Sequence, residues 1–276
     1  MRMYTRARPW VFVMAAFGVA VAFTLAYFLA VRTRSGQVLD ERAFDGARLG
    51  QRSIAPVTLS LLDSLPIIAV VIAFLVTVVV TAVRRNWASF VIAMVAAGLA
   101  NLATQMLKEL VLDRPDFGVH GYAFNSFPSG HTTLAASAAL VFFLAVSPNL
   151  RPMAAAVGAL FTIVTGVSTL ANQWHRPSDV IAALLVVAFF GCLAGAVLTG
   201  LQPHHDPPAR SPWNSALDWV AVLCIVVAGL AVAGSTAELP LPSISLPLAY
   251  IGGVAGISAV GFLLAIAASR SFRTFR

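Results

Sequence analysis

The sequence predicts an all-α protein, a polytopic membrane helical bundle with about eight transmembrane helices. Hydrophobic residues make up 59% of the 276-residue chain and charged residues only 11%, with a mean hydropathy of +0.87. Because a soluble domain carries about a quarter charged residues, this composition cannot cover a surface in water. The apolar residues also fall in runs of about 20, the length of a helix that crosses a bilayer.

Eight apolar runs are long enough to cross a membrane. They lie at about 10–31, 59–83, 87–107, 131–147, 153–171, 179–200, 215–234 and 247–268. The first run follows a basic N-terminus and is longer than the roughly 7–15 apolar residues of a secretory signal, so we expect a retained anchor. The long connection 32–58 mixes charge with helical periodicity and can form a short helix on the membrane surface. We therefore expect a single integral membrane domain over residues 1–276.

The distribution of cations favours a cytoplasmic location for both termini, which eight spans place on one side of the membrane. With the N-terminus inside, ten Lys and Arg residues lie on inner segments and eight on outer ones. The bias becomes clear only when Lys108, Arg114 and Arg176 are set aside as functional residues. The richness in Ala, Val and Arg indicates a bacterium of high GC content, and hence a bacterial plasma membrane. The outer face then carries the polar segments 108–130, 172–178 and 235–246.

The net charge of +7 does not indicate a nucleic-acid partner. The cations lie between apolar runs and not along one solvated face, which favours anionic lipid or phosphate as the partner. Cys192 and Cys224 fall within apolar runs, where a lone cysteine acts as a small hydrophobic residue. His204 and His205 lie in a proline-rich segment that is more typical of a connector than of a metal site. The sequence does not indicate which oligomeric state the protein adopts. We expect no cofactor.

The end of the third run carries a polar helical face. Asn101, Gln105 and Lys108 are spaced four and three residues apart, so they share one side of a helix. Such a face at the end of a membrane helix points into the bundle or into a wet cavity. Lys108 is the only lysine in the chain, and Arg114 follows it in the loop sequence DRPD. Snorkelling of a long cation to the interface explains Lys108 equally well.

The segment NSFPSGHTTLAAS combines a turn with the start of the fourth run. Backbone N–H groups at a helix start form an anion site, and Gly130 lets an anion approach the backbone closely. His131 can titrate near neutral pH, which suits proton transfer. An ordinary capped helix start, with Ser129 or Thr132 as the N-cap, accounts for the serine but not for the histidine. His120 is expected to be a loop residue without a catalytic role.

The segment QWHRPSD joins the fifth and sixth runs. Pro177 and Ser178 are good helix-start residues, so His175 precedes a helix and Asp179 lies in its first turn. Across four residues, the carboxylate can bond one imidazole nitrogen, fix the tautomer and leave the other nitrogen to attack. Asp179 can also stabilise the helix N-terminus, and the two roles are compatible.

Two histidines, several cations, an anion site and one orienting carboxylate are the groups that phosphoryl transfer needs. A two-metal phosphatase needs several carboxylates at each site. The outer segments offer only Asp113, Asp116 and Asp179, so we expect no metal.

Three short motifs follow one another along the chain: KELVLDRP at 108–115, PSGH at 128–131 and STLANQWHRPSD at 168–179. They resemble the signature of the type 2 phosphatidic acid phosphatase family of membrane lipid phosphatases. That signature has Lys, six residues and Arg-Pro; then Pro-Ser-Gly-His; then Ser-Arg, five residues, His, three residues and Asp. In this chain only five residues separate Lys108 from Arg114, and Thr169 stands where the third motif has arginine.

The resemblance covers roughly residues 60–200 and implies a phosphatase-like core of six helices. It implies His175 as the nucleophile and Asp179 as its orienting partner. It also implies that His131 protonates the leaving lipid oxygen and then activates water. The phosphate would be held by cationic side chains and by the backbone at the start of the fourth run: Lys108, Arg114, Ser129 and Gly130.

The leading hypothesis is a metal-independent phosphatase acting on a lipid phosphate or diphosphate at the outer membrane face. Polyprenyl diphosphate, phosphatidylglycerol phosphate and phosphatidate are the candidate substrates. Phosphotransfer to a glycan or another alcohol would use the same phosphohistidine intermediate. Because Thr169 removes one cation from the expected phosphate site, a catalytically silent lipid-binding or transport protein is a third hypothesis. Arg176, beside the nucleophile, is the candidate to replace the missing arginine.

Overall fold

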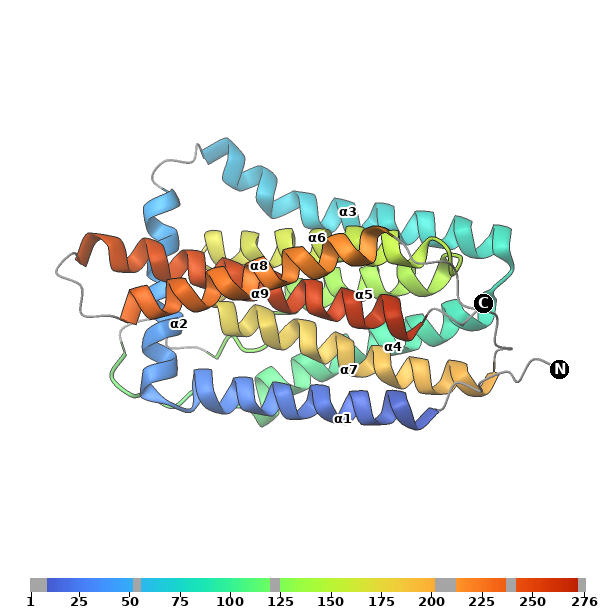
Figure 1. The fold of residues 1–276 in the computed structure, drawn as a ribbon, viewed down its shortest axis with the longest axis horizontal. Helices are drawn as coiled ribbons and strands as arrows, with labels where there is room; N and C mark the ends of the chain where they lie inside the picture. Colours follow the sequence, from blue (N-terminus) through green and yellow to red (C-terminus); the bar gives the residue numbers. More distant parts are fainter. Residues whose placement is uncertain (1–8, 52–55, 120–124, 202–211, 237–241, 273–276) are drawn as a thin grey trace.

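The computed structural model describes residues 9–51, 56–119, 125–201, 212–236 and 242–272 and folds them into a long bundle of helices (Figure 1). The α-helices in these ranges are α1 (Pro9–Ala26), α2 (Arg34–Gln51), α3 (Pro56–Arg84), α4 (Trp87–Met106), α5 (Gly130–Ala145), α6 (Arg151–Ala171), α7 (Pro177–Leu201), α8 (Pro212–Thr236) and α9 (Pro242–Ser271). Two π-helical turns, η1 (Tyr27–Val31) and η2 (Leu107–Val111), continue α1 and α4. The described ranges contain no strand, so the predicted all-α membrane bundle is confirmed.

All of these helices except α2 coincide with the eight apolar runs predicted from the sequence. Within the described residues, six helices are long and apolar enough to cross a membrane, namely those built on α1, α4, α6, α7, α8 and α9. The part of α3 from Ile68 to Arg84, and α5, are shorter apolar helices. The chain is therefore a multi-pass membrane protein.

Proline and small polar residues set the helix starts. Proline lacks the N–H that a first helical residue leaves unpaired, and its fixed φ suits that position. Five helices begin on proline, at Pro9, Pro56, Pro177, Pro212 and Pro242. Two others carry N-cap side chains: Asn86 Oδ1 accepts from the Ser89 N–H at 3.4 Å, and Ser129 Oγ accepts from the Thr132 N–H at 3.3 Å.

Helix α2 crosses one end of the bundle, while the other helices run along its length (Figure 1). It packs against α9, α6, α7 and η1. Buried residues recur at helical spacing on one face, among them Gln37, Asp40, Glu41, Phe44 and Ala47. The contact with α9 requires glycine at position 46, because a Cβ there would collide with the Leu246 carbonyl oxygen. The short surface helix predicted within 32–58 therefore has one face buried against the end of the bundle.

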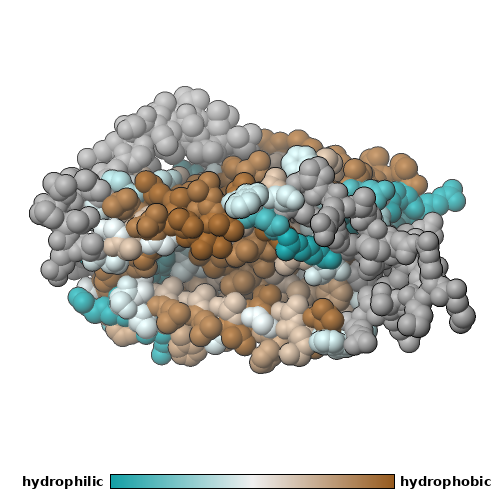
Figure 2. Space-filling view, viewed as in Figure 1, coloured by the Kyte–Doolittle hydropathy of each residue, from teal (hydrophilic) through white to brown (hydrophobic). Residues whose placement is uncertain are grey.

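The start of α1 and the end of α9 meet at the other end of the bundle. Phe12 and Phe272 pack edge to face, with ring centroids 4.9 Å apart. The buried Arg151 donates from Nη1 to the Phe272 carbonyl oxygen at 2.7 Å. Between the two ends, hydrophobic side chains cover much of the long face shown in Figure 2. Val83 and Leu230 are 79% and 70% exposed, as expected of a surface in contact with lipid.

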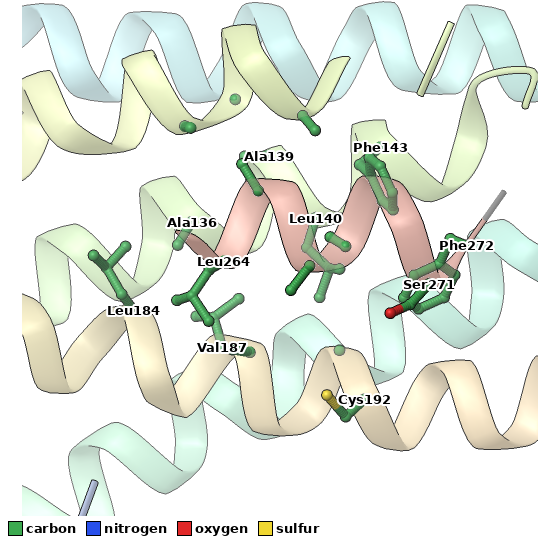
Figure 3. A pocket seen from close by; sticks show the side chains of 18 of the residues that line it. Ala136, Ala139, Leu140, Phe143, Leu184, Val187, Cys192, Leu264, Ser271 and Phe272 are labelled. Atoms are coloured by element: carbon green, nitrogen blue, oxygen red, sulfur yellow. The ribbon is translucent and has the colours of Figure 1, made fainter. Parts of the chain in front are cut away.

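An apolar cavity of about 220 Å³ lies between α1, α5, α6, α7 and α9. Figure 3 shows Ala136 of α5, Leu184 of α7 and Leu264 of α9 among the side chains around it. The cavity exceeds the roughly 150 Å³ of an engineered cavity that binds benzene. It stops short of the end crossed by α2, where Gly166 of α6 packs so closely on Val180 of α7 that a Cβ would collide.

Candidate active site

The three motif regions meet at the end of the bundle that α2 crosses. Their side chains come from four segments: Lys108 of η2, Arg114 of the following loop, His131 of α5 and His175 before α7. The Ser129 N–H donates to the Asp179 carbonyl oxygen at 3.0 Å, which ties the start of α5 to the start of α7. Gln105 of α4 lies against Gly130, with Nε2 3.4 Å from the position of a Cβ on that glycine. Segments far apart in the sequence thus form one site.

The corner between α6 and α7 holds His175 and Asp179 buried together. The Thr169 carbonyl oxygen accepts from the N–H groups of Trp174 and His175 at 2.9 and 3.2 Å, and these bonds shape the turn. His175 Nδ1 lies 3.4 Å from Asp179 Oδ2. The two side chains are only 7% and 0% exposed. Because the carboxylate engages Nδ1, Nε2 is the ring nitrogen left for nucleophilic attack.

Neighbouring donors fix the carboxylate of Asp179. Besides His175 Nδ1, its Oδ2 accepts from the Arg176 backbone N–H at 2.9 Å and from the Ser126 hydroxyl at 2.6 Å. Oδ1 is buried and has no hydrogen-bond partner among the described residues. The orientation of the carboxylate toward His175 therefore depends on Arg176 and Ser126, the second of which was not predicted as a site residue.

His131 is exposed in the first turn of α5 and lies beside His175. The two ring centroids are 6.2 Å apart, and the Trp174 ring lies 5.2 Å from His131. Ser129 caps the helix through the Thr132 N–H and also donates to Thr132 Oγ1 at 3.0 Å. Ser129 is thus the N-cap residue, and the capped helix start and the histidine are present together.

Asn101, on the polar face predicted at the end of the third run, contacts α5 inside the bundle. Asn101 Nδ2 donates to Ser137 Oγ at 3.0 Å. Lys108, the last residue of the predicted face, lies in η2 and is half-buried. Its carbonyl oxygen accepts from Asn125 Nδ2 at 3.1 Å, which connects η2 to the loop before α5.

Arg114 brings an unsatisfied donor into the site. Its Nη1 is buried and has no hydrogen-bond partner among the described residues. Burial and the nearby charge of Arg176 lower the pKa of Arg114, while the carboxylates of Asp40, Asp179 and Glu41 oppose that shift. A buried guanidinium nitrogen without a partner is costly, and a phosphate oxygen is a strong acceptor for it. The geometry at Arg114 therefore suits an oxyanion.

Two buried carboxylates of α2 reach this site, and neither was assigned to it from the sequence. Glu41 Oε2 accepts from Arg176 Nε at 2.7 Å. Asp40 accepts from both the N–H and the hydroxyl of Ser178. Burial, together with the charge of Asp179, raises the pKa of Asp40 to about 6. The sequence feature that could have pointed to these two carboxylates is the stretch LDERAFD, whose acidic and apolar residues recur on one helix face.

Arg176 and Thr169 are both buried at the corner between α6 and α7. The Arg176 guanidinium lies over the Phe44 ring, 5.2 Å from its centroid, and is bound along Nε by Glu41. Thr169 Oγ1 donates to the Gly166 carbonyl oxygen at 2.7 Å, within its own helix. The idea that Arg176 replaces the missing arginine as a phosphate ligand stays a prediction.

The remaining sequence candidates lie elsewhere. His120, His204 and His205 are outside the described residues. Cys192 in α7 and Cys224 in α8 are free thiols. Within the described part of the chain, no group of three or more His, Cys, Asp or Glu side chains is placed to hold a metal ion.

Residues 89–202 match the PAP2 superfamily. No curated protein matches the chain. Among solved structures, the chain is similar to that described as "Crystal structure of the first transmembrane PAP2 type phosphatidylglycerolphosphate phosphatase from Bacillus subtilis", with 20% identity and a TM-score of 0.55. The match covers 68% of this chain and 98% of that one, and it is a likeness of fold. All three motifs lie within residues 89–202, so the resemblance predicted from the sequence falls in the segment that matches the PAP2 superfamily.

Proposed function

We propose that the protein is a metal-independent lipid phosphatase that hydrolyses a lipid phosphate or diphosphate at the outer membrane face. The observation that carries the proposal is the buried His175–Asp179 pair beside the exposed ring of His131, with 6.2 Å between the two imidazole centroids. Two imidazoles at this separation can act on opposite sides of one phosphoryl group. The match of this region to the PAP2 superfamily supports the same chemistry.

In the first half of the reaction, His175 Nε2 attacks phosphorus. The N–P bond forms while the P–O bond to the lipid breaks, and protonated His131 gives its proton to the departing lipid oxygen. Asp179 accepts a hydrogen bond from Nδ1, which keeps the proton there and leaves the lone pair on Nε2. The lipid alcohol leaves, or a lipid monophosphate if the substrate is a diphosphate.

In the second half, neutral His131 takes a proton from water as the water oxygen attacks phosphorus. The N–P bond breaks, His175 regains its lone pair on Nε2, and inorganic phosphate departs. His131 ends protonated, ready for the next cycle, so atoms and charges balance over the two steps. Its exposure beside the buried His175 gives water access to the phosphohistidine from that side.

Cations and one backbone N–H hold the phosphate oxygens in this proposal. Arg114 contributes its buried Nη1 and Lys108 a second positive charge. Of the two predicted backbone donors, Ser129 already gives its N–H to the Asp179 carbonyl oxygen, so we assign the phosphate contact to Gly130. Loss of one such donor costs about 2.7–4 kcal/mol of transition-state stabilisation.

The arrangement of the bundle supports the proposed topology. The site lies at the end crossed by α2, whereas the start of α1 and the end of α9 meet at the other end. With both termini in the cytoplasm, as the cation distribution favours, the site faces outward. Polyprenyl diphosphate, phosphatidylglycerol phosphate and phosphatidate are the candidate lipids for a site at that surface.

The test is phosphate release from these three lipids by the purified protein in EDTA. Release by the wild type and its loss in His175→Ala are expected. Asp116→Asn is the matched control, because Asp116 is an exposed loop carboxylate whose Oδ1 accepts from the nearby Gly118 N–H. Equal release by wild type and His175→Ala, or release from no substrate, would overturn the proposal, and the second result would favour a lipid-binding role. Activity that disappears only in EDTA would refute the metal-free mechanism.

A further inference from the structure

Helix α2 holds the chain on both sides of His175. On one side, Gln173 Nε2 donates to the Phe44 carbonyl oxygen at 2.9 Å, and Arg48 Nε donates to Gln173 Oε1 at 2.9 Å. On the other side, Asp40 binds the backbone and hydroxyl of Ser178. The nucleophile therefore sits on a short segment that is fixed at both ends by a helix outside residues 89–202.

Between these two attachments lies a buried ion pair. Glu41 and Arg176 meet at 2.7 Å, with side chains only 7% and 2% exposed. Removing one partner of a buried pair leaves an uncompensated charge in a medium that screens it poorly. Glu41 therefore determines where the Arg176 guanidinium lies.

Arg176 in turn determines where the carboxylate of Asp179 lies. Its backbone N–H donates to Asp179 Oδ2, and its Nη1 donates to Ser126 Oγ at 3.3 Å. The Ser126 hydroxyl completes the path by donating to the same Oδ2, which also receives His175 Nδ1. A short series of hydrogen bonds thus runs from α2 to the nucleophile.

The same contacts distinguish Arg176 from Arg114. Arg176 is bound along Nε by Glu41 and lies over Phe44. Arg114 instead has a buried Nη1 without a partner among the described residues. Arg176 thus gives Nε and Nη1 to protein acceptors, whereas Arg114 keeps a buried donor that no described residue accepts.

We propose that Glu41 and Arg176 are positioning residues: the α2 carboxylate holds the arginine, and the arginine orients Asp179 toward His175 without binding phosphate. The guanidinium already reaches Asp179 through the Ser126 hydroxyl, so once released from Glu41 it would compete with His175 for the carboxylate. This inference rests on the proposed phosphatase function.

The test is Glu41→Gln in the full chain, with Asp45→Asn as the control. Asp45 lies one turn further along α2, is partly exposed and pairs with Arg48 at 3.3 Å. Glu41→Gln should lower kcat by about 10- to 100-fold, the scale expected of a small misplacement of a reacting group. The inhibition constant of inorganic phosphate should stay unchanged, because no phosphate ligand has been removed. Asp45→Asn should leave both quantities at the wild-type values.

Two further variants keep the test decisive. Glu41→Asp keeps the charge and should recover part of the lost kcat. Glu41→Gln combined with Arg176→Gln leaves no unpaired buried charge, so it should fold even if the single variant does not, while its kcat stays low. Thermal unfolding of Glu41→Gln, Arg176→Gln and the double variant should show coupling between the two positions. This measurement needs no substrate.

Each outcome separates the two proposals. A wild-type kcat in Glu41→Gln, or weaker inhibition by phosphate with kcat unchanged, would overturn the positioning role while the phosphatase assignment stands. A full kcat in the double variant would overturn it as well. Absence of turnover in the wild type would overturn the phosphatase assignment, and the coupling in unfolding would still report on the pair.

Discussion

Replacing Asp179 with asparagine should disable His175 while the fold stays in place. Asp179 Oδ2 accepts from His175 Nδ1, the Arg176 N–H and the Ser126 hydroxyl, at 3.4, 2.9 and 2.6 Å. Asparagine offers one uncharged acceptor oxygen and one NH₂ donor. If the oxygen takes the place of Oδ2, the negative charge beside the imidazole is lost. If the NH₂ takes that place, it faces three donors and the imidazole loses its acceptor.

The size of the effect follows from the bonds that Asp179 makes. A hydrogen bond to a charged group contributes about 1.5–3 kcal/mol, and two such losses at the transition state give about 3–6 kcal/mol. This range corresponds to a decrease in rate of about 10²- to 10⁴-fold. In the serine protease triad, the same carboxylate-to-amide change lowers kcat about 10⁴-fold. We therefore expect kcat to fall within this range.

The assay is steady-state phosphate release from the best lipid substrate, with both kcat and KM determined. KM should change by less than about threefold, because Asp179 is assigned to His175 and not to the phosphate. Size-exclusion chromatography in detergent checks that the variant is folded, and Asp116→Asn serves as the loop-carboxylate control. A well-folded Asp179→Asn protein with kcat close to the wild type would refute the nucleophile assignment. A rise in KM with kcat unchanged would instead place Asp179 in substrate binding.

Asp40 should make the stability of the folded protein depend on pH. Its pKa is raised from 3.8 to about 6. Its contribution to folding stability is therefore complete below about pH 4 and is lost as the pH rises through about 6. The Tm of Asp40→Asn, which cannot ionise, should therefore rise relative to the wild type as pH increases, and a constant difference would contradict this. Thr169→Arg should lower Tm without raising kcat, because forcing extra volume into a buried position costs about 1–3 kcal/mol; a gain in kcat would show that an arginine fits there. Ala139→Leu, at the wall of the apolar cavity, should stabilise the protein by about 0.5–2 kcal/mol in thermal unfolding, whereas a lower Tm would show that the space is not free for a side chain.

The membrane helices could be predicted because a span leaves a continuous apolar run in the sequence. The outcome for α2 was harder to foresee. Its charge and its helical periodicity are equally compatible with a surface helix and with a buried one. What buries it is contact with α9 and with the corner between α6 and α7, and both of these lie far along the chain. Tertiary packing, which a local pattern does not contain, decides between the two.

The difference between local pattern and tertiary packing also explains which site residues were predicted and which were missed. His131, His175 and Asp179 lie at helix starts, where the local sequence reveals their chemistry. Glu41 is separated from its partner Arg176 by 135 positions, so no local spacing connects them. Ser126 lies near a motif, but its bond to Asp179 depends on two helix starts meeting in space.

The boundary of the family match is not a physical boundary of this molecule. A protein reduced to residues 89–202 would keep every motif residue. It would lose Tyr27 and Val31, which pack against Phe127, as well as the whole of α2. Arg176 would then face water or lipid where Glu41 now lies. A chimera that exchanges residues 89–202 between relatives should therefore exchange α1 and α2 together with them.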